Sequence, residues 1–291
     1  MRVGFIGLGD QGLPMAQRIH GAGFPLSLWA RRSESLMPFA DRDVTIAASP
    51  AEVGRGSDVV GICLFDAAGV RDVLLGPDGV VRGLSPGGVV VVHTTLAPDE
   101  VRSIAAEVSA AGLSMLDAPV SGGHAAAERG ALTVMVGGDR TSLDRARPVL
   151  ESYATDVVHL GGVGAGQQAK LLNNAMFAAQ IVLADDVLRL GAMLGLDPQS
   201  LAGVLATSSS SCTAARTRYA VGSLAGLAAS QANPTLTKDV SLLGLALPGG
   251  AREDVLEVAE RFVMAMGAAD ATRPGAGTDG ADLAPDAVGR T

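Results

Sequence analysis

A lysine and an asparagine stand four residues apart in "GAGQQAKLLNNAMF", residues 164–177. Lys170 and Asn174 therefore share one face of a helix, with Asn173 beside them. An ammonium group in an otherwise apolar helix can act as a general acid or base, because desolvation lowers the pKa of an ammonium toward neutrality. The alternative interpretation is a lysine that is ion-paired at a junction between domains. Lys170 and Asn174 are the candidate catalytic residues.

Two other stretches carry polar groups suited to a small anionic ligand. Ser121, Gly122 and Gly123 end "LDAPVSGG", residues 116–123. Backbone N–H groups exposed by glycines bind carboxylates in anion nests, although a polar turn without a ligand explains these residues equally well. In "NPTLTKDV", residues 233–240, Lys238 precedes Asp239. Adjacent side chains point apart on a helix, so these two need not pair.

The stretch "GFIGLGDQG", residues 4–12, has the spacing G-x-G-x-x-G. The first glycine permits a tight turn, the second lets a pyrophosphate approach the backbone, and the third lets the following helix pack on the strand. The helix N-terminus then offers N–H groups to the phosphates. The pattern predicts a dinucleotide site, with a purely structural turn as the alternative. Its residues are Gly7, Leu8, Gly9, Asp10, Gln11 and Gly12.

Asp10 is unusual in such a loop, because its carboxylate has the same charge as a phosphate. One explanation is that Asp10 caps the following helix and points away from the ligand. The end of the second strand, "LWARRSES", has Ala30 where an acidic residue would bind the ribose 2′-hydroxyl of NAD. Arg31 and Arg32 follow, and two guanidinium groups suit a 2′-phosphate. We therefore favour NADP(H), with NAD(H) possible; a solvated basic loop is the alternative.

The segments around these residues alternate between strand and helix patterns through the first half of the chain. This alternation predicts a mostly parallel sheet with helices on both faces. Helical periodicity marks segments such as Pro14–Ala22 and Pro98–Ala111. The expected strands are Arg2–Ile6, Leu26–Ala30, Val59–Leu64, Val89–Thr94, Ser114–Asp117, Thr133–Gly137 and Asp156–Leu160.

Past residue 166 the strand signal disappears and long Ala/Leu-rich helical patterns begin. We expect a dinucleotide-binding domain over residues 1–162 and an all-helical substrate and oligomerisation domain over 163–270. The last helix is expected to be short. Residues 271–291, rich in Gly, Pro and Asp without periodicity, are expected to form a flexible tail.

Composition narrows the function classes. A 291-residue chain that is 48% apolar and 18% charged can bury a large core. The formal charge, 22 − 30 = −8, argues against a nucleic-acid partner. Cys63 and Cys212 are far apart and predict neither disulfides nor a metal site, which suits a reducing compartment. The longest apolar segment, 169–196, contains Asp185 and Asp186, which argues against a membrane span. We expect a cytoplasmic protein.

The histidines are not predicted to be catalytic residues or metal ligands. His20, His93 and His159 have no spacing typical of a metal site or a catalytic triad, so we expect structural roles. For His124, which directly follows Gly123, a contact with the substrate is an alternative to a structural role.

Taken together, "GFIGLGDQGLPMA", "LDAPVSGG", "GAGQQAKLLNN" and "TKDV" have the order and spacing of the β-hydroxyacid dehydrogenase family, which the chain resembles over about residues 1–270. That family includes 3-hydroxyisobutyrate dehydrogenases, tartronate semialdehyde reductases and glyoxylate/succinic semialdehyde reductases. The resemblance implies an N-terminal Rossmann domain with a doubly wound α/β sheet, a long inter-domain helix starting near residue 164, and an all-α C-terminal domain. It also implies a homo-oligomer, a dimer or tetramer.

The resemblance assigns roles on the substrate side of the site. Lys170 looks like the residue that protonates or deprotonates the substrate oxygen, and Asn174 like its neighbour that hydrogen-bonds the substrate. Ser121, Gly122 and Gly123 would hold the substrate carboxylate. The implied reaction is hydride transfer between nicotinamide and the hydroxyl-bearing carbon of a short β-hydroxy acid or the corresponding semialdehyde.

It also assigns roles on the cofactor side. Leu64 corresponds to a residue that lines the nicotinamide pocket, and Thr95 to the family's cofactor-contacting threonine. Lys238 would close the cleft near cofactor and substrate, and Asp239 would orient that region.

Some positions depart from the family pattern. Asp10 stands where an apolar or amide residue is usual, and Ala30 where many NADP-type members carry Asn. The serine run in "TSSSSCTAARTRY", residues 207–219, does not identify a substrate.

Two other functions remain open. Imine reductases share the fold and prefer NADPH, but they generally have another residue in place of the lysine, so Lys170 favours carbonyl chemistry. A non-catalytic dinucleotide-binding protein is a remoter alternative, since relatives of that kind have lost the lysine.

Overall fold

The computed structural model describes residues 1–228, 232–251 and 253–271. Contacts divide the chain into two compact units. The first holds Met1–Ala175 and Asp239–Ala251, and the second holds Met176–Lys238 and the described residues after Ala251. This division runs inside two helices, so the boundary expected between residues 162 and 163 stays a prediction. The tail expected at 271–291 lies, except for its first residue, outside the described residues.

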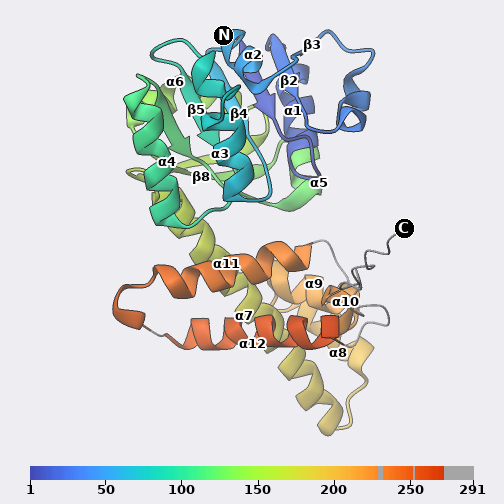
Figure 1. Cartoon of the computed structure of the whole chain (residues 1–291). Helices are drawn as coiled ribbons and strands as arrows, with labels where there is room; N and C mark the ends of the chain where they lie inside the picture. The colour runs from blue at the N-terminus through green and yellow to red at the C-terminus, as the bar shows by residue number, and fades with distance from the viewer. Residues whose placement is uncertain (229–231, 252, 272–291) are drawn as a thin grey trace, which may run out of the picture. The chain divides into compact units, whose positions relative to one another are not determined.

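A nine-stranded sheet forms the centre of the first unit (Figure 1). Its spatial order is β3-β2-β1-β4-β5-β6-β8-β7, with β9 paired to β8. Strands β1 to β6 pair in parallel, whereas β8 is antiparallel to β6 and β7. The strands are β1 (Val3–Ile6), β2 (Leu26–Trp29), β3 (Thr45–Ile46), β4 (Val59–Ile62), β5 (Val89–Val92), β6 (Ser114–Asp117), β7 (Val120–Ser121), β8 (Leu132–Gly137) and β9 (Ala154–Gly161).

Helices cover both faces of this sheet, as the strand–helix alternation predicted. In β5, Val89 and Val91 belong to one apolar cluster and Val90 and Val92 to the other, because successive side chains of a strand point to opposite faces. One face packs against α1 (Gly12–Gly21), α5 (Gly123–Glu128) and α6 (Arg140–Leu150). The other packs against α2 (Pro50–Arg55), α3 (Ala67–Leu75) and α4 (Pro98–Ala110).

All seven strands expected from the sequence are present, with ends shifted by no more than two residues. The two-residue strands β3 and β7 were not predicted, because a strand of that length has no alternating pattern to detect. The described residues also form three short 3₁₀ helices: η1 (Ser33–Phe39), η2 (Val80–Arg82) and η3 (Pro248–Gly250).

Beyond residue 164 the described part of the chain is built from helices alone, which confirms the predicted helical half. They are α7 (Ala165–Met193), α8 (Pro198–Thr207), α9 (Thr213–Val221), α10 (Leu224–Ala228), α11 (Ala232–Ala246) and α12 (Asp254–Ala271) (Figure 1). The expectation of a short last helix is wrong: α12 has 18 residues and buries Leu256, Ala259, Phe262 and Met266 at helical spacing.

Two neighbouring acids of α7 anchor other helices of the second unit. The buried Arg218 of α9 donates from Nε to Oδ1 of Asp185 at 2.8 Å. Arg261 of α12 lies 2.9 Å from Oδ2 of Asp186. These pairs explain why acids interrupt the long apolar segment. Within the described residues, the helices are each too short or too polar to cross a bilayer.

Candidate active site

The three glycines of the first loop differ in what surrounds them. Gly7 has φ +99°, and a Cβ there would lie 2.1 Å from the carbonyl oxygen of Cys63. A Cβ on Gly12 would lie 1.9 Å from the carbonyl oxygen of Gly7. Gly9 has open space, with no atom within 4 Å of an added Cβ. The first and third glycines are therefore needed by the fold, whereas the second leaves a cradle at the N-terminus of α1, where a pyrophosphate fits.

This contrast gives a test of the cradle. We expect Gly9→Ala to leave Tm unchanged but to raise the Kd for dinucleotide at least about tenfold, because the methyl occupies the approach to the loop. Gly12→Ala should instead lower Tm, because its methyl meets backbone. Gly21→Ala, in equally open space at the far end of α1, is the matched control. Thermal unfolding and equilibrium binding measure both effects; full binding by Gly9→Ala would support a purely structural turn.

Asp10 does not cap α1, contrary to the explanation considered from the sequence. The N-cap residue is Gln11, and no side chain accepts a hydrogen bond from the first turn of the helix. Asp10 is exposed, and its Oδ1 lies 3.2 Å from Nδ1 of His124. The side-chain amide nitrogen of Gln11 is buried, and no acceptor among the described residues meets it. A donor without an acceptor in this loop fits a ligand with anionic oxygens.

Arg31 and Arg32 lie at the same edge of the sheet as the glycine loop. Because β1 and β2 are parallel and in register, with Ile6 opposite Trp29, the chain leaves both strands side by side. Both arginine side chains are exposed, and within the described residues neither forms an ion pair. Two unengaged guanidinium groups there fit a phosphate on the adenosine ribose.

The ends of β4 and β5 are tied together beside the loop. The hydroxyl of Thr94 accepts a hydrogen bond from the backbone N–H of Leu64 at 2.9 Å. A Cβ on Gly7 would approach the Leu64 side chain to 3.0 Å, so Leu64 lies against the glycine turn. Thr95, the next residue, is buried. The structure thus places Leu64 and Thr95 at the carboxyl edge of the sheet, where ligands of such sheets bind.

The start of α7 is fixed by two buried side chains that sequence reasoning missed. Asp117, at the end of β6, accepts from the backbone N–H groups of Gly164 at 2.7 Å and Gln167 at 2.8 Å. Gln167 in turn donates to the Thr94 carbonyl at 2.9 Å and accepts from the Leu96 N–H at 3.0 Å. Burial raises the pKa of Asp117, and the backbone N–H groups oppose that shift.

Lys170 and Asn174 both lie on α7, one turn apart, as predicted. Lys170 is half-buried, whereas Asn174 is buried. The Asn174 amide donates to Oδ2 of the buried Asp239 at 2.6 Å, and its oxygen accepts from Asn173 at 3.0 Å. Asp239 therefore fixes the orientation of the asparagine that stands beside the lysine.

The loop predicted to bind the substrate, residues 120–123 and here called the substrate loop, is formed by β7 and the first residues of α5. Ser121 is half-buried and pairs with Thr133 of β8. Gly122 and Gly123 are exposed, with φ of +130° and +71° that other residues rarely adopt. Their role as a carboxylate site stays a prediction. So does the role of Lys238, which belongs to the second unit.

His93, which follows β5, has the structural role expected for it. The Nδ1–H of the buried His93 donates to the Ala118 carbonyl at 2.7 Å, so Nε2 accepts from the Tyr153 hydroxyl at 3.1 Å. Burial lowers the pKa of His93 to about 4, which keeps the ring neutral.

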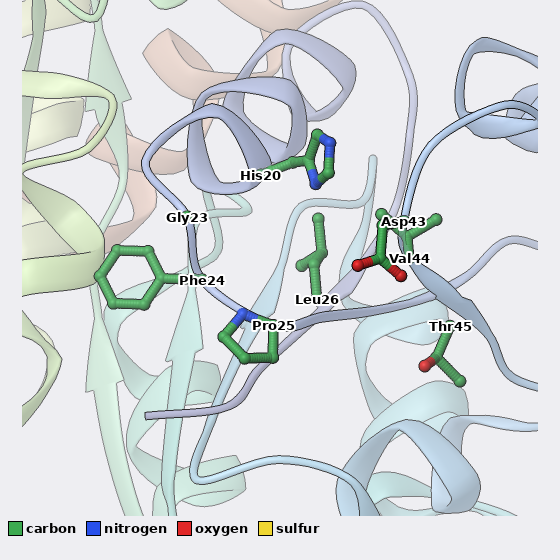
Figure 2. A pocket seen from close by; sticks show the side chains of 8 residues that line it. All are labelled: His20, Gly23, Phe24, Pro25, Leu26, Asp43, Val44 and Thr45. Atoms are coloured by element: carbon green, nitrogen blue, oxygen red, sulfur yellow. The ribbon is translucent and has the colours of Figure 1, made fainter.

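A separate surface hollow does not belong to this site. Figure 2 shows it at the amino end of β2, the edge of the sheet opposite the glycine loop. Its volume is about 270 Å³. The residues lining it are His20, Gly23, Phe24, Pro25, Leu26, Asp43, Val44 and Thr45.

Comparison with known proteins identifies the family. Residues 2–161 match the family model described as the NAD binding domain of 6-phosphogluconate dehydrogenase. Residues 164–275 match that described as NAD-binding of NADP-dependent 3-hydroxyisobutyrate dehydrogenase. The chain belongs to the β-hydroxyacid dehydrogenase family. This confirms the resemblance drawn from the four motifs, and members of this family are NAD(P)-dependent oxidoreductases.

Individual relatives agree with this membership. A probable mitochondrial 3-hydroxyisobutyrate dehydrogenase of Dictyostelium discoideum is 36% identical over 72% of this chain, and the match spans 65% of that protein. An NAD-dependent L-serine dehydrogenase of Pseudomonas aeruginosa is 37% identical over 72% of this chain and 70% of its own length. The solved structure of Mycobacterium tuberculosis 3-hydroxyisobutyrate dehydrogenase with L-serine is 28% identical, with a TM-score of 0.79 over 94% of this chain and 100% of that chain.

Imine reductases share the fold of this β-hydroxyacid dehydrogenase family member. That of Streptomyces aurantiacus has a TM-score of 0.62 and 20% identity over 92% of this chain and 95% of that chain. At that identity the likeness concerns the fold alone.

Proposed function

We propose that this protein oxidises a short β-hydroxy acid, or reduces the corresponding semialdehyde, with Lys170 as general acid and base. The observation that carries the proposal is the arrangement on α7. Lys170 lies one turn from Asn174, whose amide is held by the buried Asp239. The helix begins on the buried carboxylate of Asp117. Such support keeps a proton-transferring group in place.

The scarcity of lysine supports this role. Of the 22 Lys and Arg residues, only Lys170 and Lys238 are lysines, and every other basic position is arginine. Arginine supplies charge and bidentate bonds but does not release its proton in the physiological range, whereas burial makes a lysine ammonium able to do so by lowering its pKa. The two lysines are therefore the residues to which the resemblance assigns a role in the site, Lys170 in "GAGQQAKLLNN" and Lys238 in "TKDV".

The residues divide the chemistry as follows. Lys170 accepts the hydroxyl proton during oxidation and returns it during reduction. Asn174 hydrogen-bonds the same substrate oxygen, and Ser121, Gly122 and Gly123 hold the carboxylate. Asp239 positions Asn174 rather than contacting the substrate. When bound, the nicotinamide supplies or takes up the hydride.

We further propose that NADP(H) is preferred over NAD(H). NADP-dependent and NAD-dependent enzymes both occur among the matches. Support for NADP(H) comes from the exposed Arg31 and Arg32 after β2, and from Ala30 in place of an acid.

Replacing Arg31 or Arg32 by alanine should raise the Kd for NADPH about 10- to 100-fold, since each removes a hydrogen bond to a charged group. The Kd for NADH should hardly change, because NADH has no 2′-phosphate. Arg82→Ala, an exposed arginine of η2, controls for the loss of one positive charge. Titration with both dinucleotides checks this; a wild type that binds NADH more tightly than NADPH would contradict the preference.

A panel assay tests the function itself. Absorbance of NADPH and NADH is followed with 3-hydroxyisobutyrate, L-serine, short semialdehydes and keto acids, and cyclic imines. We expect turnover of β-hydroxy acids or semialdehydes. Turnover of imines alone would support an imine reductase, and binding without any turnover would support a non-catalytic protein.

We also propose a homo-oligomer, a dimer or tetramer, in the cytoplasm. The second unit exposes apolar side chains on α7 and α8, among them Leu190, Met193 and Val204, and α8 buries none of its residues. Sedimentation as a monomer at micromolar concentration would contradict the oligomer. The free thiols of Cys63 and Cys212 suit a reducing compartment, and fractionation of cells that puts the protein elsewhere would contradict it.

A further inference from the structure

His124 contacts the glycine loop although 114 residues separate it from Asp10. Its Nδ1 lies 2.7 Å from the Asp10 carbonyl oxygen and 3.2 Å from the Asp10 carboxylate. On the other side of the ring, Nε2 lies 3.4 Å from Oε1 of Glu128. The residue that follows the substrate loop therefore touches the loop that binds the dinucleotide.

The partners of the ring determine which form of it fits. A carbonyl oxygen only accepts, so Nδ1 must carry a hydrogen and donate it to Asp10. In a neutral ring, Nε2 is then a bare acceptor that faces the carboxylate of Glu128, also an acceptor. Only the doubly protonated imidazolium donates on both sides. The geometry alone thus favours the charged ring.

No cation competes with His124 in its surroundings within the described residues. α5 packs on α1 and β8. Arg18 of α1 has other contacts: its Nε donates to the Ser152 carbonyl at 3.1 Å, and its guanidinium lies against Gly130. β8 contains no ionisable residue. The charged groups that face the ring are Asp10 and Glu128, and Arg129 follows at the C-cap of α5.

Asp10 places a negative charge beside the Gly9 cradle, where it opposes a pyrophosphate. We infer that His124 is a positioning residue of the dinucleotide site: its imidazolium neutralises Asp10 and ties the glycine loop to α5, so that dinucleotide binds more tightly when His124 is protonated. The inference rests on the proposed function only in requiring that this loop binds a dinucleotide. It also gives Asp10, the residue that departs from the family pattern, a partner.

The electrostatics agree with this geometry. The hydrogen bond to the Asp10 carbonyl raises the pKa of His124 most. Desolvation lowers this pKa by a smaller amount, and the charges of Asp10 and Glu128 raise it further. For a raised pKa, the stabilising contact is fully present below the ordinary histidine pKa of about 6.5 and is lost as pH rises through the higher folded value. Binding should weaken over that same interval.

The test measures binding rather than turnover. Trp29, the only tryptophan, lies at the end of β2 and reports dinucleotide binding by fluorescence. NADH is the probe, because it lacks the 2′-phosphate, whose second pKa of about 6 would titrate in the same range. We expect the wild-type Kd for NADH to rise about two- to fivefold between pH of about 6 and 8.5, the size expected for an exposed charge pair.

Two variants separate charge from contact. His124→Asn keeps a donor near the position of Nδ1 but cannot be charged, so its Kd should stay at the wild-type high-pH value throughout. Asp10→Asn removes the opposing charge, so it should bind more tightly than wild type at high pH. In the protein without cofactor, NMR titration of His124 should show a lower pKa in Asp10→Asn than in wild type.

The outcomes are distinguishable. Parallel Kd curves for wild type and His124→Asn, or an unchanged His124 titration in Asp10→Asn, would overturn this inference and leave the proposed function intact. Failure of wild type to bind NADH and NADPH at every pH would overturn both.

Discussion

Replacing Lys170 by alanine should lower kcat about 10²- to 10⁴-fold, the usual contribution of a positioned acid or base. The Kd for NADPH should stay within about twofold of wild type, because the proposed role of Lys170 is proton transfer with the substrate and not cofactor binding. Steady-state kinetics on the substrate found in the panel, with a separate binding titration, measure the two effects.

Lys170→Arg shows whether the proton or only the charge matters. Arginine keeps a positive group on the same face of α7 but does not give up its proton near neutral pH. We therefore expect Lys170→Arg to be nearly as impaired in kcat as Lys170→Ala. Lys238→Arg, at the only other lysine, is the matched control and should change KM more than kcat. An active Lys170→Arg variant would show that Lys170 contributes its positive charge and does not transfer a proton.

Replacing Asp117 by asparagine lowers the free energy of unfolding by about 1–3 kcal/mol and reduces kcat as well. Both carboxylate oxygens of Asp117 accept backbone N–H groups at the start of α7, and the side chain is fully buried. An asparagine turns an NH₂ donor toward one of those N–H groups, so two donors face each other. We therefore expect the first turn of α7 to shift, and Lys170 with it.

Chemical denaturation gives the loss of stability, and kinetics gives the loss of kcat. Asp139→Asn is the control, because Asp139 also accepts a backbone N–H at a helix start, that of Ser142 at 2.9 Å, but is exposed. Its cost should be smaller. An Asp117→Asn variant as stable as wild type would contradict the role of these two hydrogen bonds in holding the start of α7.

The fold could be predicted from the sequence to the extent that it depends on local patterns. The strands were predicted from short apolar runs, and the shared helix face of Lys170 and Asn174 was predicted from their spacing of four residues. Both signals lie within a few residues of the sequence. The length of α12 was underestimated even though its buried residues follow helical spacing.

The support of the site could not be predicted, because it depends on contacts between distant residues. Asp117 is 47 residues from Gly164, Asn174 is 65 from Asp239, and Gln167 is 73 from Thr94. A buried acid or amide gives no periodic signal. The contact between Asp10 and His124 was not predicted for the same reason, because 114 residues separate them. From the sequence alone, Asp10 could be explained only as a cap of the helix that follows it.

The double hydrogen bond of Gln167 sets the rotational phase of α7 three residues before Lys170. Each residue turns an α-helix by about 100°. One residue inserted between Gln167 and Lys170 would swing the ammonium to another face, whereas insertions beyond Asn174 would leave it in place. The direction of the Lys170 side chain therefore depends on the few residues that follow Gln167, whereas the later turns of α7 must keep Asp185 and Asp186 opposite Arg218 and Arg261.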